Sequence, residues 1–563
     1  MKIKTYIVIM CASLLVAGCS LDFDETNGDT KETAYSYYDN LEKLVAYVYS
    51  FLPTDLDRND GAMLESATDN SIYSWEQNTI YDIGNNVWSP IKTIDTGWDY
   101  FDAIRSANSF LENFDIEVLN KFEYNDDYEE IKAKATLFPY EVRFLRAFYI
   151  FELARRYGNI PLLLRTYEPE EINLVEPSSF DAVVDFIVTE CDRIIADNGL
   201  PVDHRDYRGD TGRATKGAVL ALKSRALLYA ASPLHNPSGE PAKWEKAAKA
   251  AAAVIAMNKY SLPKVGSDPL YMGDNNLFNS PQLIFERRDG AKTSTFEARN
   301  EPMGYEGSKG GNTPTQNLVD AFEMKNGTPF DWNNADHVRN MYVDELGNPT
   351  RDPRLYLNVL YNGATWLKQR VETNVGGLHT GMDGATKTGY YLRKHMNAQV
   401  SLNPVSPLGK EHHFPLFRYA EILLNYAEAM YHWVGEDTKP TDYPYSAREA
   451  LNLVRDCADM KHVEETGNAF LERLRNERRI ELAFEDHRFW DIRRWKTGEV
   501  VNILLGDDAL SAQHGRVDKA ALNILLDHPR VEADGGVKIV YAAVNGLAGP
   551  ALPKLGHRFY LLN

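Results

Sequence analysis

The densest cluster of ionisable side chains lies in residues 475–499, RNERRIELAFEDHRFWDIRRWKTGE, where arginines alternate with carboxylates around phenylalanine and tryptophan. Two carboxylates can catalyse proton transfer when their pKa values differ and both face a cleft. Acids and bases alternate too evenly here for such a pair, and the aromatic neighbours favour burial. We therefore predict a structural network in which guanidinium and carboxylate groups satisfy one another, not a catalytic cluster.

On one helix over residues 468–489, two pairs of opposite charge lie three residues apart: Arg478 with Glu481, and Glu485 with Arg488. Such neighbours attract one another by about a few tenths of a kcal/mol when exposed. The sequence predicts these local pairs, together with their partial burial. As large apolar residues, Trp98, Trp490 and Trp495 are expected in the core.

The first residues are typical of an export signal that ends in a lipid attachment site. Lys2 and Lys4 precede an apolar run over 6–17, which is shorter than the roughly 20 residues of a membrane-spanning helix. The run leads to Val-Ala-Gly-Cys, which resembles a bacterial lipobox. We predict a signal peptide over 1–18 and fatty acylation at Cys19, the alternative being an ordinary signal peptide with an accidental cysteine.

The acidic residues directly after Cys19 resemble the signal with which some Gram-negative bacteria send lipoproteins to the outer leaflet. Several acyl chains on one cysteine would hold the protein stably at a membrane surface. The formal net charge of −20 disfavours nucleic acid as a partner, because such a surface repels phosphate backbones.

No cofactor or metal site is indicated by the sequence. Cys191 and Cys457 sit among apolar residues without the spacing of metal ligands, so we predict buried, inert thiols. His412 and His413 lack a carboxylate at ligand spacing nearby, and we expect them in an exposed loop.

Helical periodicity recurs along the chain, and alanines lie where neighbouring helices would cross. Such pairs resemble tetratricopeptide hairpins, which stack because small residues let backbones approach closely. Residues from about 260 to 415, and those at 60–97, are instead rich in loop-forming residues. We predict a mainly α fold, a tetratricopeptide-like scaffold of helical pairs with an irregular, loop-rich lobe inserted. The expected helices span 41–51, 96–114, 137–157, 179–196, 215–231, 243–257, 419–434, 447–457 and 468–489.

The run RRIELAFEDHRFWDIRRW at 478–495 looks like the C-terminal signature of the SusD/RagB family of outer-membrane nutrient-binding lipoproteins. Other segments agree with it, and the resemblance spans essentially the whole chain. These segments are Ala107-Asn108, RFLRAFY at 143–149, YGNIPL at 157–162, DPR at 352–354 and RYAEILLNYAEA at 418–429.

The resemblance implies a cell-surface protein rather than an enzyme. Family members are lipid-anchored in the outer membrane, face the exterior and cover a SusC-like TonB-dependent transporter, to which they deliver a captured oligosaccharide or sometimes a peptide. It also implies a division of the chain into a lipid anchor and tether (19–40), an N-terminal helical part with a ligand loop at 60–97 (41–260), the lobe (261–415) and a C-terminal helical part (416–563).

In the family, ligand-binding aromatics come from the loops after the first helix and from the irregular lobe. Aromatic rings offer apolar planes to the C–H faces of sugars, and polar side chains bind the hydroxyls. The matching positions imply ligand contacts from Trp75, Tyr73 and Trp88, then from Tyr305 and Trp332, with Asn70, Asp69 and Arg299 as candidate polar contacts.

Two other functions compete with glycan capture. A lipid-anchored glycoside hydrolase would need two carboxylates about 5–10 Å apart across a cleft, and no acid here stands in a recognisable catalytic motif. A peptide-binding scaffold would use the groove of the helical stack. The sequence leaves the ligand open among several glycans and peptides, and it leaves open whether calcium orders the lobe.

Overall fold

The computed structural model describes residues 31–497, apart from 57, 84–93, 205–210, 272–276 and 375, together with 530–531 and 537–538. The predicted leader, its lipid attachment site Cys19, and Trp88 lie outside the described residues. Among the helices of the described ranges, none combines the length and the apolar character needed to cross a membrane.

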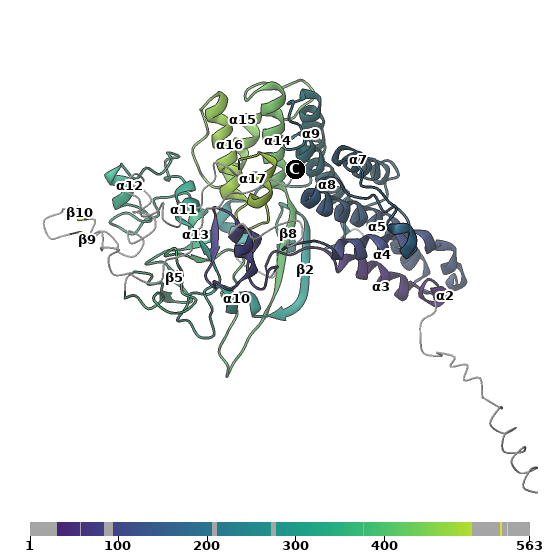
Figure 1. Ribbon diagram of the computed structural model, residues 1–563, viewed down its shortest axis with the longest axis horizontal. Coiled ribbons are helices and arrows are strands. Elements are labelled where there is room, and N and C mark those ends of the chain that lie inside the picture. Colours follow the sequence, from purple (N-terminus) through teal and green to yellow (C-terminus); the bar gives the residue numbers. More distant parts are fainter. Residues whose placement is uncertain are drawn as a thin grey trace, which may run out of the picture.

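Helices dominate the fold and pack largely in chain order (Figure 1). Helices α3 and α4 pack on the long α5, which contacts α7; α7, α8, α9 and α14 then follow one another, and α14 also packs on α15 and α16. The protein is thus mainly α-helical, as predicted. The helices are α2 (Lys31–Ala34), α3 (Tyr38–Tyr49), α4 (Asp99–Asn113), α5 (Tyr128–Tyr157), α6 (Pro169–Ile172), α7 (Phe180–Ala196), α8 (Lys216–Ala231), α9 (Pro241–Ile255), α10 (Thr295–Asn300), α11 (Gln316–Ala321), α12 (Ala335–Arg339), α13 (Leu355–Asn358), α14 (Tyr419–Val434), α15 (Ala447–Cys457), α16 (Gly467–Glu481) and α17 (Arg488–Arg494).

Polar caps set several helix starts where the sequence placed them. The side chains of Ser179 and Thr215 accept hydrogen bonds from the backbone at the starts of α7 and α8, and Ser446 forms a capping box with Glu449 at the start of α15. The alanines of α8 and α9 are mostly buried between these helices, as expected for close helical pairs. Cys191 and Cys457, the free cysteines of the described ranges, are both buried, as predicted.

The predicted irregular lobe is built around one long antiparallel pair of strands, β2 and β8, which runs downward from the helices in Figure 1. The remaining strands of the described ranges are short and form two-stranded sheets. The strands are β1 (Ser71–Tyr73), β2 (Leu283–Thr293), β3 (Asn312–Pro314), β4 (Val359–Leu360), β5 (Thr365–Trp366), β6 (Gln369–Arg370), β7 (Tyr391–Leu392), β8 (Lys410–Arg418), β9 (Arg530–Val531) and β10 (Val537–Lys538). The division into parts at 260 and 415 stays a prediction.

Three placements differ from the sequence expectations. His412 and His413 are not in an exposed loop but buried on β8, where they meet the carboxylates of Glu297 and Glu286. Trp98 is 65% exposed, because it stands before the first residue of α4 and so misses the buried stripe of that helix.

The predicted helix over 468–489 is broken. Helix α16 ends at Glu481 and α17 starts at Arg488, because Phe484 and Asp486 between them both have φ near +60°. This left-handed backbone reverses the chain, so that charged residues expected on one helical face point to different elements.

The local pairs expected along that helix are therefore replaced by long-range ones. Arg478 donates to Asp491 at 2.8 Å, and Arg488 binds both carboxylate oxygens of Asp69 at 2.8 and 2.9 Å. Glu481 accepts from Arg354 of the lobe and from Arg418, which is the last residue of β8 and directly precedes α14. These side chains are nearly all buried, so the scaffold network predicted from 475–499 is confirmed.

Arg418 holds the centre of this network. Its guanidinium donates to Glu485 at 2.6 Å, to Glu481 at 2.6 Å and to Gln282 at 3.0 Å. Burial raises the pKa of Glu481, but Arg418 and Arg354 outweigh burial and lower this pKa to about 2. The carboxylate thus stays charged inside the protein because arginines surround it.

We expect Arg418→Met to destabilise the protein strongly. The substitution keeps an apolar stem but leaves the buried carboxylates of Glu481 and Glu485 with fewer partners, a change that typically removes about 3–5 kcal/mol. Thermal unfolding should show a clear fall in Tm. Arg193→Met is the matched control, because the Arg193 side chain is 58% exposed and lies 4.0 Å from its partner Asp197. Equal effects of the two variants would contradict a central role for Arg418.

Candidate functional site

Pairing of β1 with β3 brings together the two regions in which the sequence placed ligand contacts. Ser71 lies opposite Pro314 and Tyr73 opposite Asn312, although the strands are far apart in the chain. The ladder continues one step further, where the Ser74 amide donates to the Gly311 carbonyl at 2.9 Å. The next residue, Trp75, is therefore delivered beside the glycine-rich loop 303–311.

Trp75 presents part of its indole to solvent while its polar edge is bound. The side chain is 38% exposed, and its indole Nε1 donates to the Lys309 carbonyl at 2.7 Å. The ring also lies against Gly384, where a Cβ atom would come within 2.4 Å of the indole. One ring is thus fixed by a hydrogen bond and a backbone contact, which limits the entropy lost when a ligand binds.

The second loop at this surface, residues 376–389, was not singled out from the sequence. A Cβ atom on Gly310 would come within 2.4 Å of the Gly384 carbonyl, so the two loops touch through glycines. Beside Trp75, Lys387 pairs with Glu76 at 2.6 Å, and Leu378 and Met382 are 70% and 41% exposed. We call this set the crown surface; it comprises Trp75, Glu76, Leu378, Met382 and Lys387.

Tyr305 supports this surface from below. Its side chain is 7% exposed, its ring packs on His379 with 4.9 Å between centroids, and its hydroxyl donates to the Trp366 carbonyl at 3.2 Å. The Trp366 indole in turn donates to Glu301 at 3.3 Å. Burial, with a smaller contribution from Glu297, raises the pKa of Glu301 to about 7.

Three of the implied ligand contacts are buried or paired with other residues, namely Tyr73, Arg299 and Trp332. Tyr73 is nearly buried, and a Cβ on Gly61 would meet both its hydroxyl and the Arg299 guanidinium. Arg299 is 3.7 Å from Asp60. Trp332 is nearly buried against Phe330 and donates to Asp320 at 2.9 Å. Of the implied aromatic contacts that the structure describes, Trp75 has the most exposed ring.

The polar candidates Asp69 and Asn70 are structural. Asp69 binds Arg488 and also Arg479, at 2.9 Å, while Asn70 accepts from Arg479 at 2.6 Å and donates to Glu65 at 2.6 Å. Burial raises the pKa of Asp69, but the two arginines outweigh burial and lower this pKa to about 2. These groups are buried and already paired, so they fix the base of β1 and present no polar atom to a ligand.

The sequence did carry a signal for the missed loop. Residues 376–389 hold five glycines, at 376, 377, 381, 384 and 389, together with the apolar Leu378 and Met382. Such density of glycine allows close backbone approach, and isolated apolar residues between glycines favour an exposed binding loop. Within the described residues no group of three or more His, Cys, Asp or Glu side chains is arranged to hold a metal ion.

Comparison with known proteins agrees with this architecture. A sequence model of the SusD family matches residues 281–529. SusD-like protein P38 of Formosa agariphila is 24% identical over 483 residues, which cover 80% of this chain and 81% of that protein.

Two solved structures from Bacteroides fragilis share the fold over most of the chain. One is a SusD-like protein, 27% identical with a TM-score of 0.65, and the other is a SusD-like carbohydrate-binding protein, 26% identical with a TM-score of 0.66. Each match covers 84% of this chain and 88% of the other. The family model, the curated relative and the two solved structures together support the SusD/RagB family for this chain.

We expect Gly384→Ala to displace the Trp75 ring, because the new methyl group would overlap the indole. The control is Gly381→Ala, since both glycines have similar positive φ values, +78° and +75°, but Gly381 has no heavy atom within 4 Å of the added Cβ. The measurement is the indole N–H resonance of Trp75, assigned with Trp75→Phe. A shift in Gly384→Ala alone would locate the effect at the contact, whereas equal shifts in both variants would contradict it.

Glu301 predicts a pH dependence of stability. Its folded pKa of about 7 exceeds the ordinary value of 4.5, so the folded state binds more protons between these limits. Stability contributed by this group is therefore full below pH 4.5 and falls as the pH rises to 7. Between pH 4 and pH 8, the free energy of unfolding of Glu301→Gln should rise by about 2–3 kcal/mol relative to that of the wild type. The measurement is calorimetry at both pH values. Glu345→Gln is the control, because Glu345 is exposed, and its stability should follow the wild-type pH profile. A wild-type profile for Glu301→Gln would contradict the prediction.

Proposed function

We propose that the protein captures oligosaccharides on its crown surface and does not cleave them. The observation that carries the proposal is the partly exposed indole of Trp75, held by the Lys309 carbonyl and the Gly384 backbone. A fixed aromatic plane suits the flat C–H face of a sugar ring, and the neighbouring charged pair of Glu76 and Lys387 can exchange its hydrogen bonds with sugar hydroxyls.

The similarity to the SusD/RagB family and the likeness to a carbohydrate-binding member support this proposal. In the full proposal a lipid on Cys19 holds the protein at the outer membrane, on the exterior side. A SusC-like TonB-dependent transporter receives the cargo from the crown surface. Moderate affinity suits this task, because a capture protein must release what it binds.

A hydrolase is the second candidate, and Glu301 is the group that would favour it. A carboxyl with a pKa near 7 is what a glycosidase uses as its general acid. Glu301, however, is 2% exposed and lies beneath Tyr305 and Trp366, where a glycosidic oxygen has no access. Its raised pKa is explained by burial, and we propose binding without turnover.

Peptide cargo is the alternative within the family. Leu378 and Met382 offer apolar contacts that a peptide side chain would use as readily as a sugar, while the indole plane favours a sugar ring. A binding panel that includes polysaccharides and peptides decides between the two.

We expect Trp75→Ala to weaken glycan binding by at least about tenfold, the equivalent of roughly 1.4 kcal/mol, without lowering Tm. The measurement is affinity electrophoresis and calorimetric titration of the full chain against a panel of plant, algal, microbial and host polysaccharides. Tyr124→Ala is the control, because this aromatic residue is 91% exposed on the helical scaffold.

Three results would contradict the proposal. They are no binding across the panel, equal effects of Trp75→Ala and Tyr124→Ala, and release of reducing sugar by the purified protein. Preferential binding of peptides would move the proposal to the peptide-binding alternative.

A further inference from the structure

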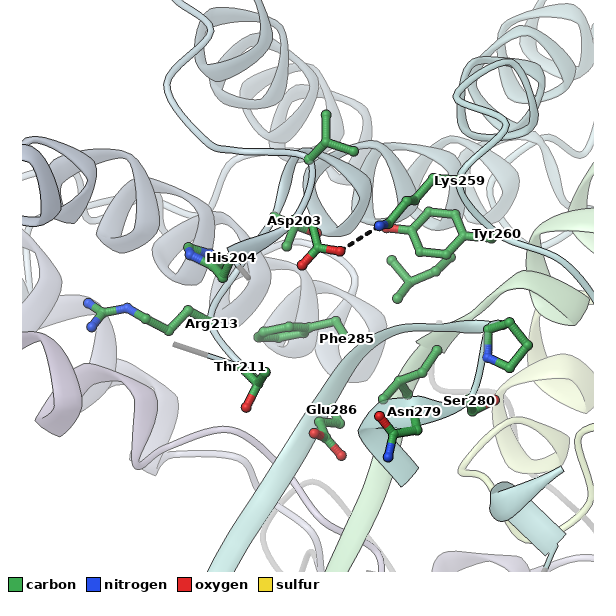
Figure 2. A pocket seen from close by; sticks show the side chains of 16 residues that line it. Asp203, His204, Thr211, Arg213, Lys259, Tyr260, Asn279, Ser280, Phe285 and Glu286 are labelled. Atoms are coloured by element: carbon green, nitrogen blue, oxygen red, sulfur yellow. Dashed lines mark hydrogen bonds and ion pairs between the residues drawn. The ribbon is translucent and has the colours of Figure 1, made fainter. Parts of the chain in front are cut away.

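The cavity shown in Figure 2 lies on the helical scaffold and shares no residue with the crown surface. It has a volume of about 290 Å³, and its walls include Lys259 and Asp203, which form the 2.5 Å ion pair drawn as the dashed line. A chain held at Trp75 would instead meet the loops that touch the glycine-rich loop of the crown surface.

A third loop, residues 401–409, touches this glycine-rich loop. A Cβ atom on Gly307 would lie 3.2 Å from the Cβ of Leu402. Beside this contact, Nδ2 of Asn403 donates to Oε2 of Glu306 at 3.0 Å, and this hydrogen bond is exposed. The two loops thus meet through a close glycine contact and one exposed polar pair, Glu306 with Asn403, which we call the tip pair.

The third loop is stabilised by its own hydrogen bonds. The backbones of Ser401 and Leu408 exchange two bonds, of 2.9 and 3.0 Å. Oδ1 of Asn403 accepts from the amides of Val405 at 2.8 Å and Ser406 at 3.2 Å. A ligand that binds here therefore orders few additional groups, which lowers the entropic cost of binding.

The tip pair has hydrogen-bonding capacity beyond its own bond. An amide carries two N–H donors and a carboxylate has about four acceptor positions, so the bond between them uses only part of each. A donor and an acceptor lie side by side, which suits two neighbouring hydroxyls of a sugar. Val405, which is 93% exposed, adds an apolar surface for the C–H groups of the same ring.

An exposed stretch of chain joins the tip pair to Trp75. Glu306, Gly307 and Lys309 are exposed, and the Lys309 carbonyl accepts the hydrogen bond from the Trp75 indole. Three residues of chain span at most about 11 Å, so the Cα atoms of Glu306 and Lys309 lie within that distance. This distance is more than one sugar ring covers and is within the reach of an oligosaccharide.

We propose that the tip pair is a second subsite of the crown surface, where a distal ring binds when the first ring of the oligosaccharide lies on Trp75. The inference rests on the proposed function, because it needs a chain held at the indole. Nδ2 of Asn403 donates to one hydroxyl of the distal ring, and Glu306 accepts from the neighbouring hydroxyl. The crown surface then selects for chain length, since only an oligosaccharide reaches both places.

The test is titration calorimetry of the full chain with laminari-, cello-, malto- and xylo-oligosaccharides of two and of six units. The wild type should bind the six-unit form of at least one series about fivefold more tightly than the two-unit form. Asn403→Asp keeps the Oδ1 that stabilises the loop, but it replaces the donor with a second carboxylate oxygen beside Glu306. It should weaken six-unit binding about fivefold and leave two-unit binding within about twofold.

The turn that contains Leu346 supplies matched controls. Nδ2 of Asn348 also donates to an exposed carboxylate, that of Asp344 at 2.9 Å, so Asn348→Asp breaks a similar bond and adds the same charge. Leu346 is 87% exposed and its amide is likewise bonded to Oδ1 of Asp344. Val405→Ser should weaken six-unit binding about threefold, because it removes apolar contact, whereas Leu346→Ser should not.

Three results would overturn the second subsite. They are equal effects of Asn403→Asp and Asn348→Asp on six-unit binding, equal weakening of two-unit and six-unit binding by Asn403→Asp, and binding of no six-unit probe. Unchanged binding in Asn403→Asp, which belongs to the first result, would leave the third loop free for a protein partner. The polysaccharide panel tests the proposed function separately, so capture at Trp75 can stand when the tip pair fails.

Discussion

A charge buried without a partner destabilises a protein by several kcal/mol, and this fold buries many arginines and carboxylates. Arg354, Arg418, Arg478 and Arg494 are each at most 1% exposed, and each faces carboxylates. Their partners lie on different elements, so pairing every charge fixes how α14, α16 and α17 sit against the lobe. Satisfying these charges is therefore the constraint on which the arrangement of helices and lobe depends.

The same constraint reaches the crown surface through Asp69. Arg479 of α16 and Arg488 of α17 both bind this carboxylate, and Asp69 lies two residues before the first residue of β1. Strand β1 ends at Tyr73, and Trp75 follows it. The C-terminal helices thus help to position the exposed indole, because their arginines hold Asp69 and only five residues separate Asp69 from Trp75.

The helical scaffold was largely predictable from sequence because its signals are local. Apolar periodicity and the caps at Ser179 and Thr215 define where α7 and α8 lie in the sequence, without reference to the elements that pack on them. The same reasoning failed at 482–487, where the chain departs from the helix because long-range partners such as Asp69 and Arg418 outweigh local pairing. The expectation of an exposed loop also failed for His412 and His413, since their burial depends on β2, which pairs with β8 and carries Glu286, and on α10, which carries Glu297.

The candidate site was predictable only in part for a related reason. Trp75 and the region around Tyr305 were implied by the resemblance to the SusD/RagB family, but their meeting depends on the pairing of β1 with β3. The contribution of Gly384 could not be inferred at all, since nothing local ties residues 376–389 to an indole about three hundred residues earlier. Loops that meet only in the folded chain leave little trace in sequence pattern.

The contact between Gly310 and Gly384 has a consequence for how new specificities can arise. Both loops end where they join strands or packed aromatic residues of the lobe, and the crown residues described here have no role in the buried ion-pair network. Tyr305 and His379 pack on one another inside these two loops, so a change of shape that keeps the support would replace the exposed residues of 303–311 and 376–389 and retain this buried pair. Exchange of exposed residues such as Leu378 and Met382 would then alter the proposed binding surface while the buried residues beneath it stay the same.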